Sequence, residues 1–465
     1  MDNKDLILHL EEQMTRHVCS IIPPTLLLTI LENNNTSQNT RDAVQKTYDH
    51  YCKLQQHRKV RLNACRSGAT TGIPHAQGLT ARGSVGQSSH RSIIPPSLFK
   101  AIADSDDTSS VQKEHAESNI KISQQIHSAR SNAQHRTGTT PAAEPELAQM
   151  VRKIYDSKTS NKLRKTLIFQ DQGGKATTSV TDEGAKEVLQ FFEDTYQFYK
   201  EVFNRDSIDD HDLALIGSIH YDDVPGPPGM DNAFWDGDEM AFGDGDGEIF
   251  GSFTKNIDVI GHELTHGVTQ YTAALEYEFQ SGALNESVSD VFGTMIKQYF
   301  YAGGKQLAKD ADWLIGEGIF LPTITNAKAL RSMKAPGTAY DNPKVGKDSQ
   351  PADMDGYANT PNTDAGDYGG VHQNSGIPNK VFYLAATAFG GYSWEKAGKI
   401  WYAALMDDGL KNIDTSAAFT IFADLTVKYA GSLFDDDAVA VMKKVWTDVK
   451  VYKAGAGDSQ PKDDL

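Results

Sequence analysis

Residues 258–271, DVIGHELTHGVTQY, decide how the rest of the chain is interpreted. His262 and His266 are four residues apart, so on a helix they lie one turn apart on the same face. Two imidazoles in that arrangement can bind one Zn²⁺, and Glu263 lies beside them to move protons. A single match of this kind also arises on solvated helices that bind no metal. The prediction of a zinc site therefore depends on a third ligand elsewhere.

A second pair of polar groups follows in residues 281–293, SGALNESVSDVFG. Glu286 and Asp290 are again four residues apart, and Glu286 from a neighbouring helix would complete a set of two histidines and one glutamate. Asp290 is then positioned to accept a hydrogen bond from the outer nitrogen of a ligand histidine. Metzincins need Gly and His after the first helix. Thr269 and Thr272 occupy those positions, which excludes that class.

The composition limits what else the protein can be. The chain has 465 residues and a net charge of −17, and the acidic part beyond residue 130 argues against a nucleic-acid partner. No apolar run reaches the roughly 20 residues that a membrane span requires. The N-terminus has no apolar block, so we expect no Sec-type signal and a protein that is cytoplasmic or exported by a non-classical route. All three cysteines (Cys19, Cys52 and Cys65) precede the main body, which excludes a disulfide framework there.

The leader contains one phrase twice, IIPPTLLLTI at 21–30 and IIPPSLFKAI at 93–102. Each copy runs from its Pro pair into a helix-like stretch, and a second helix-like stretch follows at 42–58 and 111–130. A Gly- and Ser-rich linker separates the two copies. Duplication is the simplest explanation. The predicted organisation is a first leader copy (1–66), a linker (67–91), a second copy (92–131), a linker with the maturation region (132–146), a β-rich catalytic lobe with the zinc helix (147–273), a helical catalytic lobe (274–453) and a disordered tail (454–465).

The main body is predicted to be α+β. Short apolar segments alternate with Gly- and Asp-rich turns up to residue 255, with one helix near 183–203. Helical periodicity dominates afterwards. The later helices are predicted at 257–273, 282–301, 376–390, 393–407, 414–429 and 435–449.

Taken together, several motifs are similar to those of the thermolysin-like neutral metalloproteases: HELTH, SGALNESVSDVFG, NAFW, MAFGDGDG, LRSM and GGVHQNSGIPNK. They follow the family's order and spacing over roughly residues 150–450. The leader resembles the short prosegments of the protealysin-like branch, which contain a Pro-Pro-x-Leu element. The resemblance implies a two-lobe fold with the active-site helix between the lobes.

The resemblance also assigns functions to residues. His262, His266 and Glu286 match the ligands of one catalytic Zn²⁺, and Glu263 matches the general base. His372 and Tyr277 match the donors that stabilise the oxyanion of the tetrahedral intermediate, and Asp367 matches the carboxylate that orients His372. The matching substrate-binding residues are Asn232, Ala233 and Arg331, with Phe250, Val259 and Leu330 in a pocket that implies cleavage before bulky apolar residues.

The chain departs from the family at the paired calcium site. The matching acidic residues are Asp258, Asp310, Asp312 and Glu317. Lys297 stands where a bridging glutamate is usual, and an ammonium group can substitute for the charge of one cation. We therefore expect at most one Ca²⁺, at Asp258, Asp312 and Glu317.

The doubled Pro-Pro phrase suggests an inhibitory segment. Two prolines fix two φ angles and favour an extended chain, and the following leucine can enter an apolar pocket. We expect the second copy, with Pro95, Pro96 and Leu98, to fill the cleft, because its linker to the body is shorter. The first copy would then be a spare. A further hypothesis has the Cys19 thiolate bound to the zinc in the latent form.

The sequence therefore predicts a monomeric zinc endopeptidase that is made as a latent zymogen and acts on proteins or peptides. Its own leader would be an intramolecular inhibitor. Two alternatives remain open. One is an aminopeptidase of the wider gluzincin class, because GMDN (229–232) is faintly similar to the Gly-x-Met-Glu-Asn element of that class. The other is a catalytically silent protein that binds zinc or a partner.

Overall fold

The computed structural model describes residues 22–33, 36–49, 150–172, 175–176, 179–222, 230–363 and 366–453. The compact unit that contains these residues comprises residues 1–70 and 148–465. None of the helices in this part of the chain combines the length and the apolar character needed to cross a membrane.

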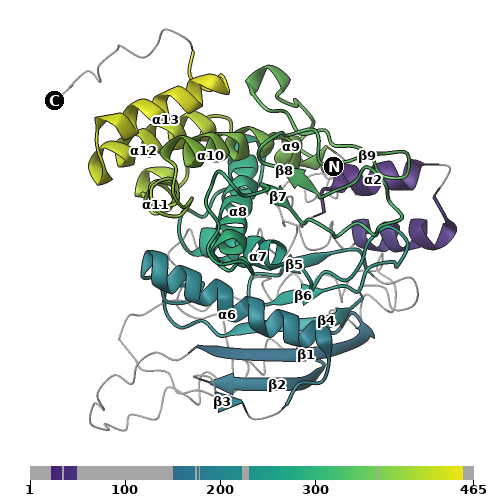
Figure 1. The fold of residues 1–465 in the computed structure, drawn as a ribbon. Coiled ribbons are helices and arrows are strands. Elements are labelled where there is room, and N and C mark those ends of the chain that lie inside the picture. The colour runs from purple at the N-terminus through teal and green to yellow at the C-terminus, as the bar shows by residue number, and fades with distance from the viewer. Residues whose placement is uncertain are drawn as a thin grey trace, which may run out of the picture. The chain divides into compact units, whose positions relative to one another are not determined.

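A six-stranded sheet forms the β-rich lobe, in the order β3-β2-β1-β4-β6-β5 (Figure 1). Its strands are β1 (Val151–Ser160), β2 (Thr166–Gln172), β3 (Lys175–Ala176), β4 (Leu215–Tyr221), β5 (Ala233–Trp235) and β6 (Met240–Phe242). Strand β4 runs parallel to β1 and β6, whereas β2 and β5 run antiparallel to their neighbours. Strand β5 is consequently the last strand of the sheet, on the side of the active-site helix.

Helix α6 (Glu183–Phe203) packs against β1 and β4. The Asp182 side chain caps its first turn by accepting a hydrogen bond from the Ala185 N–H at 2.9 Å. Asn204, with φ of 53°, ends it in the left-handed conformation. The helix predicted near 183–203 is therefore confirmed.

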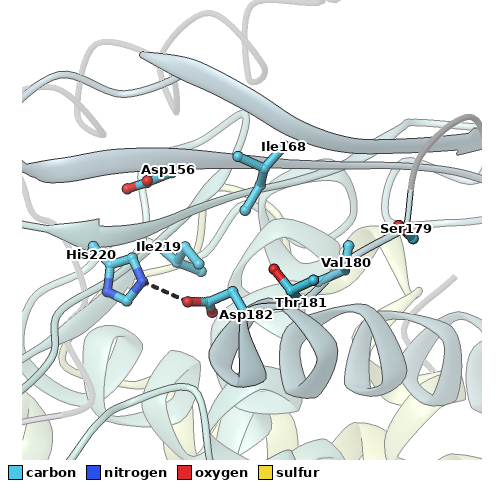
Figure 2. Close-up of a pocket in the computed structure, with 8 residues that line it drawn as sticks. All are labelled: Asp156, Ile168, Ser179, Val180, Thr181, Asp182, Ile219 and His220. Atoms are coloured by element: carbon cyan, nitrogen blue, oxygen red, sulfur yellow. Dashed lines mark hydrogen bonds and ion pairs between the residues drawn. The ribbon is translucent and has the colours of Figure 1, made fainter.

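A histidine links the start of α6 to the sheet, beside a pocket of about 210 Å³. His220 of β4 lies 3.1 Å from Asp182 through Nε2 and 2.9 Å from Asp244 through Nδ1. Figure 2 shows the imidazole facing Asp182, with Asp156 and Ile168 across the pocket. The hydrogen bond to Asp244 outweighs the opposing effect of burial and raises the pKa of His220 to about 9.

Two nearly buried helices, α7 (Ile257–Tyr271) and α8 (Phe279–Tyr299), form the centre of the unit (Figure 1). Val259, Ile260, Leu264 and Val268 of α7 are completely buried. The polar motif residues between them are also buried, because α7 packs against α6, β5 and α8 on different sides. This packing removes the zinc-motif side chains from bulk water.

Helices α9–α13 make up the helical lobe. They are α9 (Asp367–Asn374), α10 (Gly376–Phe389), α11 (Ala397–Leu405), α12 (Ala418–Leu433) and α13 (Asp436–Asp448), with short 3₁₀ turns at Met354–Gly356 and Asp408–Leu410. The aromatic rings of Trp401, Phe422 and Trp446 pack together between α11, α12 and α13. The predicted α+β class, with a helical second half, is confirmed.

Two short hairpins were not predicted from the sequence. Strands β7 (Leu314–Ile315) and β8 (Arg331–Ser332) pair antiparallel, as do β9 (Asp341–Asn342) and β10 (Gly346–Lys347). Each strand has only two residues, so none shows the alternation of polar and apolar residues on which strand prediction depends.

Part of the first leader copy is helical. Helix α2 (Pro24–Glu32) begins directly after Pro23, and residues 38–49 form a further helix. Proline at the first helical position lacks only an N–H that would have no partner inside the helix. The helix-like stretch predicted after the first Pro-Pro pair is therefore present, and the extended conformation of the pair is limited to Pro23.

Candidate active site

The three predicted zinc ligands converge between α7 and α8. Nε2 of His262 lies 3.0 Å from Nε2 of His266. Glu286 places one carboxylate oxygen 3.6 Å from His262 Nε2 and the other 3.7 Å from His266 Nε2. All three side chains are almost fully buried, and they form the one group of three such ligands in the described ranges.

These separations fit a zinc ion. Tetrahedral bonds of about 2.0–2.1 Å place neighbouring ligand atoms about 3.3–3.4 Å apart. The measured separations of 3.0, 3.6 and 3.7 Å lie on both sides of that value. Two imidazole nitrogens and a carboxylate turned toward one point are also the donor set that zinc prefers.

The outer nitrogens of both histidines have partners that fix the orientation of the rings. Asp290 lies 2.8 Å from His262 Nδ1, in the contact that the sequence predicted. Asn285 Oδ1 lies 2.8 Å from His266 Nδ1, with Ser289 Oγ at 3.0 Å, and neither residue was predicted. Because each Nδ1 is engaged, both Nε2 atoms remain directed at the metal position.

Arg331, which the sequence predicts to contact substrate, also pairs with a buried carboxylate. Its Nε and Nη2 each donate to a carboxylate oxygen of Asp290 at 2.7 Å. Burial opposes the ionisation of Asp290, but the Arg331 charge and the His262 contact outweigh it and hold the pKa of this carboxyl well below its usual range. Arg331 therefore supports the second layer of the site, and it also lines the cleft.

Glu263, the candidate general base, lies next to the edge of the sheet. The Trp235 backbone N–H of β5 donates to its Oε2 at 3.0 Å. The predicted substrate-edge residues Asn232 and Ala233 come directly before this contact and are fully buried. The base and the edge strand therefore lie together at one side of the zinc position.

His372 and Tyr277 approach the same point from the helical lobe. The Tyr277 hydroxyl lies 3.2 Å from His372 Nε2 and donates to Glu286 Oε1. Asp367 accepts from His372 at both Nδ1 (2.6 Å) and the backbone N–H (2.8 Å). Burial alone would lower the pKa of His372, but the charges of Glu286 and Asp367 raise it to about 9.

Two glycines allow these donors to meet. A side chain on Gly282 would bring its Cβ within 2.4 Å of Val371 Cγ1, so α8 can approach the His372 loop only with glycine there. Gly369, with φ of +84°, packs against the Phe279 ring in a run of left-handed residues that begins at Asp367.

The predicted S1′ residues lie together in the main core. Phe250, Val259 and Leu330 are each no more than 1% exposed, and the Phe250 ring stacks on Phe320 at 5.2 Å. Apolar residues of the first leader copy belong to the same cluster: Ile22, Leu26, Leu27, Ile30 and Val44. Leu330 also lines one small cavity with Pro23 and Thr25, so the leader lies beside this predicted pocket residue.

Polar contacts fasten the first leader copy to the catalytic lobe. Glu248 accepts hydrogen bonds from the hydroxyls of Ser37 and Thr40, at 2.5 and 2.7 Å. The Asp231 N–H donates to Thr47 Oγ1 at 2.9 Å, and the Asp231 side chain is fully buried. In this form of the protein, with the leader packed against it, the Asp231 carboxylate is therefore shielded from solvent.

The structure corrects the expected assignment of the two leader copies. Pro23 and Thr25 of the first copy line a cavity together with Arg331 and His372, so this copy is not a spare. Pro95, Pro96, Leu98 and Cys19 lie outside the described residues. The shorter linker was a weak criterion, because doubling a flexible connection costs only about 0.6 kcal/mol.

The candidate calcium residues surround a lysine. Lys297 Nζ lies 3.1 Å from Asp312, 3.6 Å from Glu317 and 3.7 Å from Asp258, and it donates to the Leu314 carbonyl at 3.3 Å. Burial opposes protonation of Lys297, but these carboxylates raise its pKa. The residues present do not fit a calcium ion, because an ammonium group already occupies the position between them. Asp310 instead pairs with Lys309 at 3.0 Å.

These features define a zinc metallopeptidase. They are a buried cluster of two histidines and a glutamate, a second glutamate next to one of the histidines, and the edge of a sheet beside that glutamate. The chain belongs to the thermolysin family of metallopeptidases and is a metalloendopeptidase. Residues 112–270 match the family model described as the thermolysin metallopeptidase catalytic domain, and residues 273–451 match that of its alpha-helical domain.

Individual relatives agree with this assignment. Protease PrtS from Photorhabdus sp. (strain Az29) is 47% identical over 300 residues, which is 64% of this chain and 76% of that protein. The extracellular metalloprotease of Pectobacterium carotovorum subsp. carotovorum is 41% identical over 363 residues, or 77% of this chain and 96% of the relative. The solved precursor of protealysin, the metalloproteinase of Serratia proteamaculans, superposes with a TM-score of 0.59 at 44% identity. It covers 78% of this chain and all of that one.

The predicted location is wrong. We expected a cytoplasmic protein or one exported by a non-classical route, because the N-terminus lacks an apolar block. The Pectobacterium relative, aligned over nearly its whole length, is named an extracellular metalloprotease. The composition of about twenty N-terminal residues was therefore a poor guide to the compartment.

Proposed function

We propose that this protein is a secreted zinc endopeptidase, made as a latent precursor, that cleaves peptide bonds before bulky apolar residues. The observation that carries the proposal is the convergence of the His262, His266 and Glu286 ligand atoms, with separations of 3.0–3.7 Å, next to Glu263. Bound zinc supplies Lewis-acid chemistry, which lowers the pKa of a water molecule and polarises a carbonyl group.

Glu263 is proposed as the general base. It takes a proton from the attacking water and delivers it to the leaving nitrogen of the peptide. Its contact with the Trp235 N–H fixes the carboxylate beside the sheet edge. Because the side chain is buried, its electrostatic interactions are stronger than they would be in water.

Tyr277 and His372 are proposed to stabilise the negative oxygen that develops on the scissile carbonyl. Both side chains are donors at neutral pH, and they lie 3.2 Å apart. The Asp367 contact holds the His372 ring so that Nε2 faces the cleft. Donors that are oriented before the reaction need no reorganisation when the charge appears.

The first leader copy is proposed to maintain latency. Pro23 and Thr25 lie against the cleft wall, and Leu26 and Leu27 are buried in the cluster that contains Phe250, Val259 and Leu330. Because Leu330 lines the same cavity as Pro23 and Thr25, we propose that the leader hinders the entry of an apolar substrate side chain into the S1′ pocket. The similarity between residues 93–102 and the first copy is then explained by duplication, as the sequence suggests.

Mass spectrometry over time tests the catalytic proposal. Full-length wild type and Glu263→Ala would be purified identically and incubated, and we expect only the wild type to lose its leader. Both forms would also be assayed on a blocked internal peptide and on an aminoacyl substrate with a free N-terminus. Cleavage of the aminoacyl substrate alone would contradict an endopeptidase.

Matched substitutions in the two leader copies test the latency proposal. A charge at buried Leu26 should release the first copy, so we expect Leu26→Asp to shorten the lag before full activity. Leu98→Asp is the corresponding change in the second copy and should leave the lag unchanged. The reverse outcome would assign latency to the second copy.

A further inference from the structure

A small cavity separates the first leader copy from the cleft wall. Pro23 and Thr25 line one side, and Arg331, Gln350 and His372 are among the residues on the other. Its volume of about 10 Å³ is close to the minimum for one water molecule. The leader therefore covers this part of the cleft without filling it.

Two glutamines that line the cavity, Gln350 and Gln373, each have a buried amide oxygen without a hydrogen-bond partner among the described residues, and Gln350 is the one whose orientation is fixed. Gln350 is 7% exposed, and its Nε2 donates to the His372 carbonyl at 2.8 Å and to Ser375 Oγ at 3.0 Å. Because a carbonyl oxygen only accepts, the amide nitrogen must face His372, which fixes the opposite orientation for Oε1. This oxygen is buried and has no hydrogen-bond partner in the part of the chain that the structure describes. Leaving such an acceptor unsatisfied costs about 1–3 kcal/mol.

The position of Gln350 is fixed by its surroundings. Its backbone N–H donates to Asp348 Oδ1 at 3.0 Å, and the other oxygen of Asp348 accepts from the Ala339 N–H, also at 3.0 Å. A side chain on Gly376 would come within 3.0 Å of Gln350 Cβ. The acceptor is therefore oriented before any ligand arrives, which lowers the entropy lost on binding.

The leader segment beside this acceptor is poor in donors. Of the two leader residues that line the cavity, Pro23 has no backbone N–H. Thr25 has an N–H and a hydroxyl, but within the described residues neither donates to Gln350 Oε1. A bound peptide, by contrast, carries an N–H at every residue that is not proline. Leu330 and Arg331 line the same cavity, and Leu330 belongs to the proposed S1′ pocket, so the cavity lies on the C-terminal side of the scissile bond.

We propose that Gln350 binds substrate by accepting a hydrogen bond through Oε1 from a main-chain N–H of the peptide, one or two residues beyond the residue in the S1′ pocket. This inference rests on the proposed peptidase function. It makes Gln350 a specificity determinant, because proline at the matching substrate position has no N–H to donate. It also distinguishes a substrate from the leader, which covers the acceptor without satisfying it.

The test combines changes in enzyme and substrate. Full-length wild type and Gln350→Met would each complete their own maturation and then be assayed on one parent peptide and on versions N-methylated at the second or third residue after the scissile bond. Methionine keeps the length of the side chain but has no amide oxygen. At one of the two positions we expect N-methylation to lower kcat/KM about 10–100-fold in wild type and no more than about 3-fold in Gln350→Met.

The loss caused by N-methylation in wild type is divided by the loss in Gln350→Met. This ratio separates a hydrogen bond to substrate from the effect of Gln350 on the position of His372. Loss of the Nε2 hydrogen bonds slows Gln350→Met on all peptides equally and cancels in the ratio. Equal losses in both enzymes at both positions would overturn the proposal, whereas cleavage of the parent peptide by wild type would still uphold the peptidase function. Gln350→Ala removes the same acceptor and replaces Gln350→Met if that variant does not fold. Ester analogues that lack only the N–H give a second measurement, and undiminished cleavage by wild type at both positions would also overturn the proposal.

Discussion

Helices α7 and α8 contribute to two clusters of polar side chains, one that binds a metal cation and one that contains a lysine. At the zinc centre, His262 and His266 of α7 and Glu286 of α8 face one another across 3.0–3.7 Å. At the beginning of α7, Asp258 lies 3.7 Å from Lys297, near the end of α8. The first cluster leaves its donor atoms for an external metal, whereas the second is neutralised by the protein's own ammonium group.

The difference shows that residue type alone does not define a metal site. Both clusters contain carboxylates, but only the zinc centre directs all its donor atoms at a position without a protein charge. The zinc ligands are buried, whereas Asp312 and Glu317 of the lysine cluster are exposed. His220 is a third case. Its two ring nitrogens face Asp244 and Asp182, on opposite sides of the ring. No nitrogen of His220 is left to bind a metal, so the imidazolium itself is the cation.

Removal of a zinc ligand should have the largest effect. His266→Ala leaves two protein ligands, so we expect zinc content to fall from about one ion per chain to a small fraction and kcat/KM to fall on the order of 10³-fold or more. Elemental analysis and peptide cleavage would measure both. His220→Ala is the matched control and should keep its zinc. Loss of zinc from the control would remove the distinction between the clusters.

Lys297 provides the second test. Lys297→Gln leaves the buried Asp258 carboxylate without its cation, and we expect the free energy of unfolding to fall by about 3 kcal/mol. Denaturant titration in a Glu263→Ala background would measure this without self-cleavage. In the Glu263→Ala protein that retains Lys297, neither calcium nor a calcium-selective chelator should change the unfolding midpoint. Lys297→Glu should make the midpoint rise with calcium. A calcium-dependent midpoint with Lys297 present would contradict our interpretation of this cluster.

Asp290 tests the layer behind the zinc ligands. Asp290→Asn weakens the contact that orients His262, and we expect zinc affinity to fall about 10–100-fold, measured by competition with a chromophoric chelator. Asp312→Asn alters a carboxylate of the lysine cluster in the same way and should leave zinc affinity unchanged. Equal affinities for the two variants would show that Asp290 only pairs with Arg331.

The His220 cluster should give the smallest effect, through pH. The pKa of His220 is raised from its ordinary value near 6.5 to about 9, so its protonated form favours the folded state. The stabilisation is complete below pH 6.5 and is lost as pH rises through 9. We expect a contribution of about 1–2 kcal/mol, reduced from the full shift by its partial exposure. Unfolding midpoints of wild type and His220→Gln should converge between pH 6.5 and 10, and parallel curves would exclude this role.

The zinc centre could be predicted from the sequence because its chemistry restricts both residue type and spacing. Two histidines four apart, and a glutamate and aspartate four apart, each specify one helix face, and the structure brings these faces together. Asn285 and Gln350 could not be found in this way. Each is a single amide whose function depends on which distant group it meets, and neither belongs to a spacing pattern. The position of Asn285 directly before Glu286 was the one available signal.

The fold was predictable at the level of its long elements. Helices α6, α7, α8 and α10–α13 have apolar periodicity or capping residues that can be recognised locally. The short helix α9, which has left-handed residues inside it, was not predicted. The hairpins β7–β8 and β9–β10 depend on tertiary contacts, as does the choice between the leader copies. For that choice, the decisive contacts are those of Ser37 and Thr40 with Glu248, which lies more than 200 residues away.

The place of β5 at the end of the sheet has a consequence for the partners of this protein. A chain that bound along β5 would have to lie flat and extended and offer its own backbone groups, as a strand added to the sheet does. A helix or a tightly folded domain could not do so without first opening locally. Susceptibility to cleavage would then follow the local unfolding of the target, and flexible loops and tails would be cut well before the folded cores beside them.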